Sequence, residues 1–284
     1  MTRRAMRRDA PRMTRMTRMT RMTRLARRFV APLAVVVAAV IGCADFGTSP
    51  DGIGALDFTG IPFPAVVTGD TMRDTLGAVA PLKATVYSGS GAVIANADVQ
   101  FVSLDTGVVI SADGFLRATK RDGTVRLVAS VNGLQSQQRT VIVTRTPSEL
   151  IAGSTALAFT YRVPDGAANV SPALSLSLKT ADTTGALSAN VAGWLVRWRV
   201  IHNGDTLSAT DTTTAALWSP SGARHTLRDT TKTDGTASRR LRVYTNLLPL
   251  QPDSFIVIAE VKARGAHVPG SPVRYVVVIT PPTI

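Results

Sequence analysis

From about residue 64 to its end, the chain alternates apolar and polar residues over short runs. Leu82, Ala84 and Val86 alternate with Lys83 and Thr85, and a similar period recurs at Ala97–Phe101. Turn-forming pairs such as Asp113-Gly114 and Asn132-Gly133 separate these runs. An apolar residue at every second position places these side chains on one face of a strand, and Asp-Gly and Asn-Gly suit tight hairpin turns. The pattern predicts an all-β fold of the sandwich type.

The second half repeats the pattern with longer runs. Trp194, Val196, Trp198 and Val200 share one phase, which predicts that both tryptophans are core residues. A sugar-stacking platform formed by these two rings is the alternative interpretation. The segment Phe255–Val261 is apolar on both phases apart from one glutamate, which predicts a strand in the centre of a sheet.

The turn signals divide this part of the chain into two modules. Thr146-Pro147-Ser148 is a short linker between an immunoglobulin-like β-sandwich at 61–146 and a second one at 147–284. The second module carries a Thr-rich insert at 203–231. Because only this linker is expected to join the two modules, each should unfold at its own midpoint, and residues 61–146 should fold alone.

The N-terminal part has an unbroken apolar run instead. Phe29–Ile41 is thirteen residues long and follows Arg27-Arg28. It is shorter than the roughly twenty residues of a membrane span and is typical of a secretory signal. The run ends in Val40-Ile41-Gly42-Cys43, which resembles the lipobox of bacterial lipoproteins. The resemblance implies a signal peptide at 1–42, cleavage between Gly42 and Cys43, acylation of Cys43, and a flexible lipidated tether at 43–60.

An acylated Cys43 would make membrane lipid a partner of the protein and place it in the cell envelope. Ala44, in place of the aspartate that retains enterobacterial lipoproteins in the inner membrane, favours the outer membrane. Residues 13–24 repeat Met-Thr-Arg four times. We interpret residues 1–21 as lying upstream of an alternative start at Met22; the other interpretation of the repeat is a basic RNA-binding arm.

The net charge changes this picture little once its distribution along the chain is considered. The formal charge is +13, but residues 1–42 hold eleven of the 32 Lys and Arg residues and one of the 19 acidic residues. The remainder therefore has 21 basic and 18 acidic residues, a charge of +3. Nucleic-acid binding requires clustered cations that displace counterions, so we expect no nucleic-acid partner.

Both modules resemble known families. In the first, Leu82–Val86, Ala97–Phe101, Ser111–Ala118 and Gly123–Leu127 are similar to the strands and hairpin of the bacterial Ig-like group 2 family. In the second, Trp194–Trp198 and Thr233–Ala237 resemble the invasin/intimin-type group 1 repeat. These resemblances imply sandwich folds of cell-surface proteins, and the families share no catalytic residues that could be transferred.

Few residues suggest chemistry. Trp218, in the polar insert beside Ser219-Pro220, is the candidate for an exposed binding aromatic. No other candidate has a supporting partner: the histidines are scattered, the aspartates lack the spacing of a calcium loop, and the Ser219–Gly222 segment with His225 has nothing to orient a nucleophile. The residues concerned are His202, His225, His267, Asp205, Asp211, Asp229 and Asp234. The sequence therefore predicts no enzyme, no cofactor and no metal site.

The single cysteine excludes an internal disulfide. Together these features predict a membrane-anchored extracytoplasmic lipoprotein that acts as a surface or envelope interaction or adhesion module, with a polysaccharide or a protein as ligand. A structural spacer or subunit of an envelope complex is the alternative. A carbohydrate-binding or hydrolytic protein is a more distant one.

Overall fold

The computed structural model describes residues 52–120, 122–162, 169–223, 226–244 and 251–281. All regular structure in these residues is β-strand, which confirms the all-β prediction. Among the same residues, no helix is long and apolar enough to cross a membrane. The segment Thr48–Ile284 forms one compact unit.

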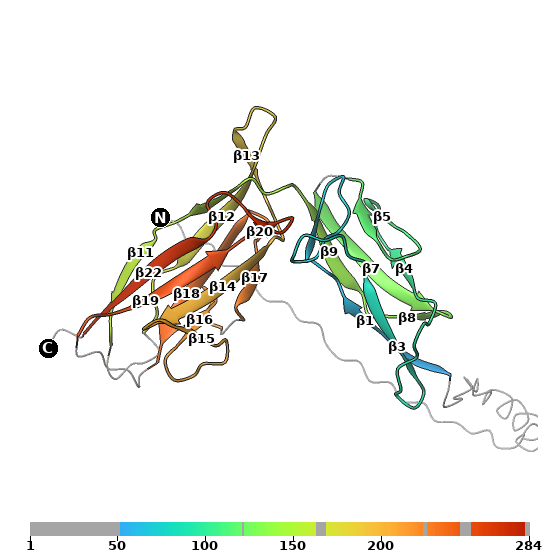
Figure 1. Ribbon diagram of the computed structural model, residues 1–284, viewed down its shortest axis with the longest axis horizontal. Helices are drawn as coiled ribbons and strands as arrows, with labels where there is room; N and C mark the ends of the chain where they lie inside the picture. The colour runs from blue at the N-terminus through green and yellow to red at the C-terminus, as the bar shows by residue number, and fades with distance from the viewer. Residues whose placement is uncertain (1–51, 121, 163–168, 224–225, 245–250, 282–284) are drawn as a thin grey trace, which may run out of the picture. The chain divides into compact units, whose positions relative to one another are not determined.

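The first module is a sandwich of short strands (Figure 1). Its strands are β1 (Ile53–Gly60), β2 (Ala65–Val67), β3 (Lys83–Ser88), β4 (Gln100–Ser103), β5 (Val108–Ile110), β6 (Leu116–Ala118), β7 (Gly123–Val131), β8 (Leu134–Gln135) and β9 (Arg139–Thr144). One sheet has the order β2-β9-β7-β4 with β8 on β7, and the pairs β1-β3 and β5-β6 complete the module. The predicted hairpin at Asp113-Gly114 joins β5 to β6, where Ile110 pairs with Leu116.

Strand β1 corrects the predicted tether at 43–60 for its last part, residues 53–60, while residues 43–51 lie outside the described residues. This strand pairs antiparallel with β3, and Leu56 lies opposite Val86. Phe58 is buried in the module core, and its ring centroid lies 5.3 Å from that of Phe101. The glycines at the start of this segment suggest flexibility, but its pairing with β3 makes it a strand, in which Leu56 and Phe58 lie on the same face.

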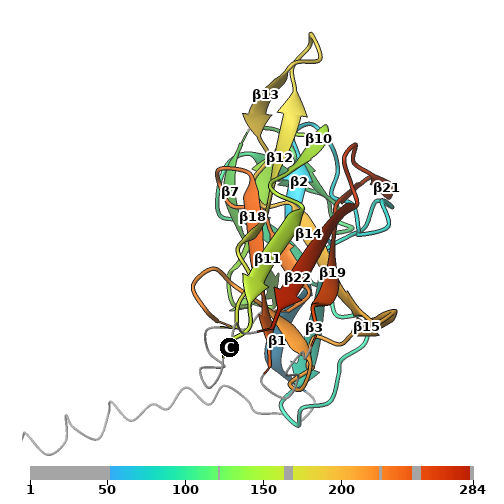
Figure 2. The same ribbon diagram turned by 90° about the vertical axis from the view of Figure 1, so that its left-hand side faces the viewer.

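The second module consists of two larger sheets. Its strands are β10 (Glu149–Ala152), β11 (Ala156–Thr160), β12 (Leu174–Ala181), β13 (Leu187–Asn190), β14 (Leu195–His202), β15 (Asp205–Leu207), β16 (Ala215–Trp218), β17 (Arg228–Thr230), β18 (Thr236–Val243), β19 (Asp253–Glu260), β20 (Lys262–Ala263), β21 (Ala266–His267) and β22 (Val273–Thr280). The strand order is β10-β12-β18-β16 in one sheet, with β13 on β12. The other sheet has the order β11-β22-β19-β14-β15, with β17 on β14, and Figure 2 shows β11, β22 and β19 side by side.

The core between these sheets confirms two predictions. Trp194 and Trp198 are 6% and 2% exposed, so they are core residues and not a sugar-stacking platform. Strand β19 is the middle strand of its sheet, as its two-sided apolar pattern predicted. The Thr-rich insert, in contrast, is not a simple loop, because it contributes β15, β16 and β17.

One charged side chain enters this core. Arg239 is 3% exposed and forms an ion pair with Asp229 on β17, while its guanidinium donates to the carbonyls of Ser238 and Arg228. A buried charge is tolerated only when it is paired and hydrogen-bonded. Arg239 shares the inward-facing phase of Ala237 and Leu241, and the acceptors of β17, Asp229 and the Arg228 carbonyl, allow its side chain to be buried there.

Candidate functional site

Gly42 and Cys43, the expected cleavage and lipidation residues, lie outside the described residues, as does His225. The only candidate binding residue that the structure describes is therefore Trp218. It is the last residue of β16 and pairs with Arg240 on β18. Trp218 is partly buried, so its predicted position in an exposed loop is wrong. The reason is the preceding Ala-Ala-Leu segment, whose side chains are buried and which pairs with β18.

Trp218 lies on the outer face of its sheet together with two residues of β18 and the residue that follows this strand. Residues directly opposite each other on paired strands share a face, and Leu217 and Leu241 form the inward pair. Trp218, Arg240, Arg242 and Tyr244 therefore point outward. We call these four residues the Trp218 face.

A stacked guanidinium is the central feature of the Trp218 face. Cζ of Arg242 lies 4.4 Å from the ring centroid of Trp218 and 5.8 Å from that of Tyr244. At these distances the rings hold the guanidinium by cation–π attraction. Arg240 is exposed beside them. The outward positions of β16 and β18 thus carry two positive charges and no carboxylate.

The side chains of Arg242 and Trp218 have hydrogen-bond donors with no acceptor among the described residues. Nε of Arg242 and Nε1 of Trp218 are enclosed and have no hydrogen-bond partner. The two Nη groups of Arg242 are not enclosed in this way, and no other described residue forms a hydrogen bond or ion pair with them. Among the described residues, Arg242 is therefore positioned by aromatic rings and not by hydrogen-bond acceptors, and its Nη groups can donate to a ligand.

The sequence reasoning missed Arg240, Arg242 and Tyr244. A signal for them is present, because these residues alternate with Leu241 and Val243, whose apolar side chains face inward. The partner strand cannot be identified in the same way, since β16 belongs to the insert that the sequence predicts to be a loop.

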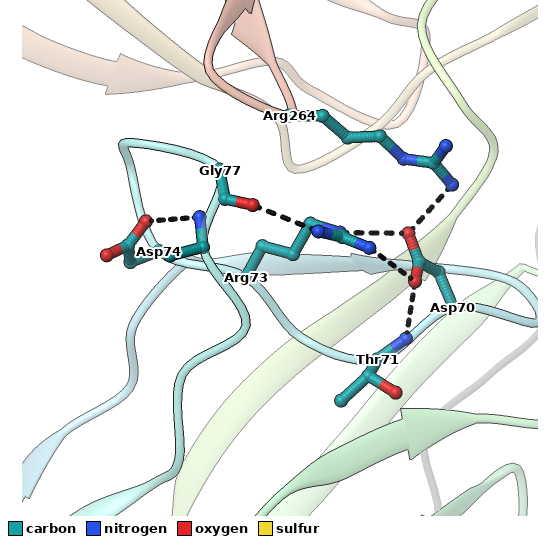
Figure 3. A network of polar contacts seen from close by, with 7 residues as sticks. Asp70, Thr71, Arg73, Asp74, Gly77 and Arg264 are labelled. Carbon is teal, nitrogen blue, oxygen red and sulfur yellow. Dashed lines mark hydrogen bonds and ion pairs between the residues drawn. The ribbon is translucent and has the colours of Figure 1, made fainter.

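A second cluster of polar groups lies where the two modules meet (Figure 3). Asp70 in the first module accepts hydrogen bonds from Arg73 Nε at 3.2 Å, from the Thr71 amide at 2.8 Å, and from Arg264 Nη2 in the second module at 2.9 Å. Burial raises the pKa of Asp70, but these bonds outweigh burial and hold the pKa below its usual value. The network has a structural role, because it links the two modules and each of its donors already has a protein acceptor.

Apolar and backbone contacts also join the two modules. The rings of Phe63 and Trp194 lie 4.9 Å apart, and Trp194 Nε1 donates to the Lys262 carbonyl. A Cβ on Gly77 would clash with the backbone of Arg264, and one on Gly265 would clash with the carbonyl oxygen of Leu76. The expectation that only the linker joins the modules is therefore wrong.

The pocket at this meeting point is small. Its lining includes Phe63, Asp70, Trp194 and Arg264, and its volume is about 40 Å³. That volume holds a few water molecules at most, since one water needs roughly 10–15 Å³. The pocket is too small for an organic ligand.

The remaining candidates are not brought together. His202 bonds Asp253 at 2.8 Å and stacks on Phe255, while His267 lies 3.1 Å from Glu260. The four aspartates considered for calcium lie apart: Asp211 and Asp234 accept backbone amides of their own turns, Asp229 pairs with Arg239, and Asp205 is exposed in β15. Within the described ranges, no group of three or more His, Cys, Asp or Glu residues is placed to hold a metal ion.

Ser219, the candidate nucleophile, is a turn residue. It is buried, its hydroxyl lies 2.7 Å from that of Ser221, and it accepts the Ala223 amide. Its contacts are those of a serine that stabilises the turn after β16.

Comparisons with known proteins give only distant likenesses. No family model and no curated protein matches the chain. Among solved structures, domains 4–9 of the surface layer protein SbsC are 14% identical, with a TM-score of 0.28, over 82% of this chain and 31% of that one. The Yersinia pseudotuberculosis adhesin InvE is 13% identical, with a TM-score of 0.31, over 78% of this chain and 57% of that one. A beta-glucuronidase from glycoside hydrolase family 2 is 12% identical, with a TM-score of 0.28, over 82% of this chain and 21% of that one.

This chain thus spans less than two thirds of the length of each of these three structures. Their names include a surface-layer protein, an adhesin and an enzyme, and fold likeness does not transfer function. With scores this low they carry no argument about the activity of this chain. The resemblance to the two Ig-like families stays a prediction.

Proposed function

We propose that this protein is a lipid-anchored interaction or adhesion protein of the bacterial cell envelope, held in the outer membrane by acylated Cys43, and that it acts by binding and not by catalysis. The Trp218 face is its binding surface. The observation that carries this proposal is the Arg242 guanidinium, which two aromatic rings hold on an outer sheet face with both Nη groups unpartnered among the described residues.

The physical reason is that this arrangement is pre-organised for a ligand. Aromatic side chains and arginine dominate binding hot spots, because they supply large contact areas and directional donors at low entropic cost. Stacking restrains the long Arg242 side chain before a ligand arrives, so less rotamer freedom is lost on binding. The sheet beneath provides a rigid base, which a loop would not.

A second candidate function is that of a spacer or subunit in an envelope complex. The contacts between the modules favour it, because Phe63–Trp194, Asp70–Arg264 and the two close glycine contacts restrict movement between them. A stiff pair of sandwiches is suited to hold a partner at a distance from a membrane. The two functions are compatible, since a spacer can carry a binding face.

The anchor is tested by Cys43→Ala. We expect this variant to lose incorporation of labelled palmitate and partitioning into detergent, and to accumulate as unprocessed precursor, because the thiol is the acyl acceptor and stable anchoring requires the attached chains. Palmitate incorporation that persists in Cys43→Ala would refute the anchor.

The binding face is tested with an array of neutral glycans, acidic glycans and peptides. We expect the purified full chain to bind a ligand in this array, and Trp218→Ala to weaken that binding by about tenfold or more, which corresponds to ~1.4 kcal/mol. A ligand whose affinity is unchanged in Trp218→Ala would place the binding surface elsewhere.

A further inference from the structure

We infer that the Trp218 face binds an acidic glycan, a sugar chain that bears carboxylate or sulfate groups. This inference rests on the proposed function, because it specifies the ligand of the same face. It is carried by the combination of two arginines, neither with an acidic partner on its face, with two aromatic rings on one flat sheet surface.

The charges on this face select an anion. Arg240 and Arg242 are two residues apart on β18 and point to the same side, so their Cα atoms are separated by roughly 7 Å. The guanidinium fork matches the oxygens of carboxylate and sulfate, and a charge-assisted bond of this kind is about twice as strong as a neutral one. Two cations at a fixed spacing favour a ligand with repeated negative charges over a single small ion.

The adjoining strand β12 adds no negative charge to this face. The outward residues of the adjoining strand β12 include Ser175, Ser177 and Lys179, and none of its outward residues is acidic. Several other described arginines form an ion pair with a carboxylate, as Arg126 does with Asp105. Arg242 differs from such residues because its guanidinium is held by the two rings and by no carboxylate of the described chain.

The rings select a sugar. Trp218 lies under the guanidinium and Tyr244 lies beside it, so a pyranose ring whose anionic substituent binds Arg242 would pack its apolar C–H groups against the exposed parts of these two rings. The negative face of the aromatic quadrupole favours the slightly positive C–H groups of the sugar. The combination therefore matches a ligand that alternates apolar ring faces with anionic groups.

Other polyanions fit less well. A nucleic acid would require many phosphate contacts, and the chain after residue 42 carries a charge of only +3. An acidic peptide could use the two arginines, but its aspartate and glutamate side chains offer no apolar ring face to Trp218 and Tyr244. Both remain outcomes of the experiment.

The test measures binding of the full chain by calorimetry at an ionic strength of about 0.15 M, where non-specific attraction is screened. The probes are oligogalacturonate, its neutral methyl ester, dextran sulfate, hexaglutamate and a single-stranded oligonucleotide. The variants are Trp218→Ala, Arg242→Gln and Arg240→Gln, and Arg274→Gln on β22 is the matched control, because it removes an exposed arginine from the opposite sheet. Arg240→Gln changes an exposed residue and keeps the test valid if Arg242→Gln is destabilised.

We expect at least one of the two acidic glycans to bind, and the comparison of oligogalacturonate with dextran sulfate to show which acidic group is preferred. We expect esterification to weaken binding of oligogalacturonate, and Trp218→Ala and Arg242→Gln to weaken binding of the preferred glycan, each by about tenfold. Arg274→Gln should have no effect.

The methyl ester could bind as tightly as oligogalacturonate and still lose binding in Trp218→Ala. This result would overturn the inference that the ligand is acidic and leave the proposed function standing. Glycan binding that survives Trp218→Ala, or no binding by either acidic glycan, would overturn the inference, and the first of these results would overturn the proposed binding face too. Equally tight binding of hexaglutamate or of the oligonucleotide would assign the face to that class instead.

Discussion

At the scale of single residues, the three tryptophans occupy two different environments. Trp198 lies between the sheets and stacks on Tyr275 with ring centroids 6.2 Å apart, while Trp218 lies on the outer face under Arg242. The alternation of apolar residues along the chain is enough to place Trp198 in the core. It does not show what covers Trp218, because Arg242 comes from a strand that is distant in sequence.

This difference predicts the effect of truncation. Trp198→Ala should lower the free energy of unfolding of the second module by about 3–5 kcal/mol, because it leaves a cavity in a closed core. Trp218→Ala should cost only about 1 kcal/mol, the contribution of a partly exposed cation–π contact. Both values are measured by urea denaturation followed by far-UV circular dichroism.

Trp198→Phe is the matched control for this prediction. It keeps an aromatic ring and removes an indole N–H that has no partner, so it should cost less than Trp198→Ala. If Trp198→Ala proved as stable as the wild type, Trp198 would not be a core residue and the strand arrangement of the second module would have to be revised.

At the scale of elements, β1 is a strand that the alternation of apolar and polar residues does not predict. Strand interiors such as Leu82–Val86 are predictable because alternation is a local property. The glycines of the segment 53–60 resemble those of a linker and favour a tether, and only the pairing of this segment with β3 reveals a strand. Pairing is non-local and leaves little trace in a single sequence.

Strand β1 can be tested within the intact chain. Phe58→Ala should destabilise the first module by about 3–5 kcal/mol, because the ring is 2% exposed and packs against Phe101. Thr59→Ala, at an exposed position of the same strand, should change stability by less than about 0.5 kcal/mol. Hydrogen exchange of peptides from the first module measures both effects.

In a flexible tether the two substitutions would be equally harmless, and the amides of residues 53–60 would exchange at once. Slow exchange of these amides in the wild type, lost in Phe58→Ala, is the result that the strand requires.

At the scale of the whole molecule, the sequence predicted two modules but not their connection. Thr146–Ser148 has the composition of a linker, and nothing in it indicates that Phe63 and Ala65 of the first module join the core cluster of the second. Gly77 and Gly265 do not indicate the junction either, since their close backbone approach depends on two turns nearly two hundred residues apart in sequence. The all-β class and the regular strand interiors of each module are thus predictable from local periodicity, whereas β1, the strands of the insert, the junction and the Trp218 face depend on contacts between distant segments.

The junction predicts that a substitution in the first module destabilises the second. Phe63→Ala should lower the midpoint of the second module by the equivalent of about 2–4 kcal/mol, because it removes a ring that packs on Trp194 and leaves a cavity in the shared core. All three tryptophans belong to the second module, so tryptophan fluorescence during urea unfolding reports that module alone. Phe58→Ala is the matched control: it truncates the same residue type in the core of the first module, and it should leave the direct packing of the second module intact.

The ion pair adds a smaller effect that depends on pH. Because the pKa of Asp70 is lower in the folded state than its usual value, its contribution is complete above that usual value and is lost as the pH falls through the folded-state pKa. Arg264 is largely exposed, so Asp70→Asn should cost well under the effect of Phe63→Ala, of the order of 0.5 kcal/mol, and should flatten the acid dependence of the second-module midpoint. If Phe63→Ala and Phe58→Ala shifted the fluorescence midpoint equally little, the two modules would unfold independently and the junction would have no energetic role.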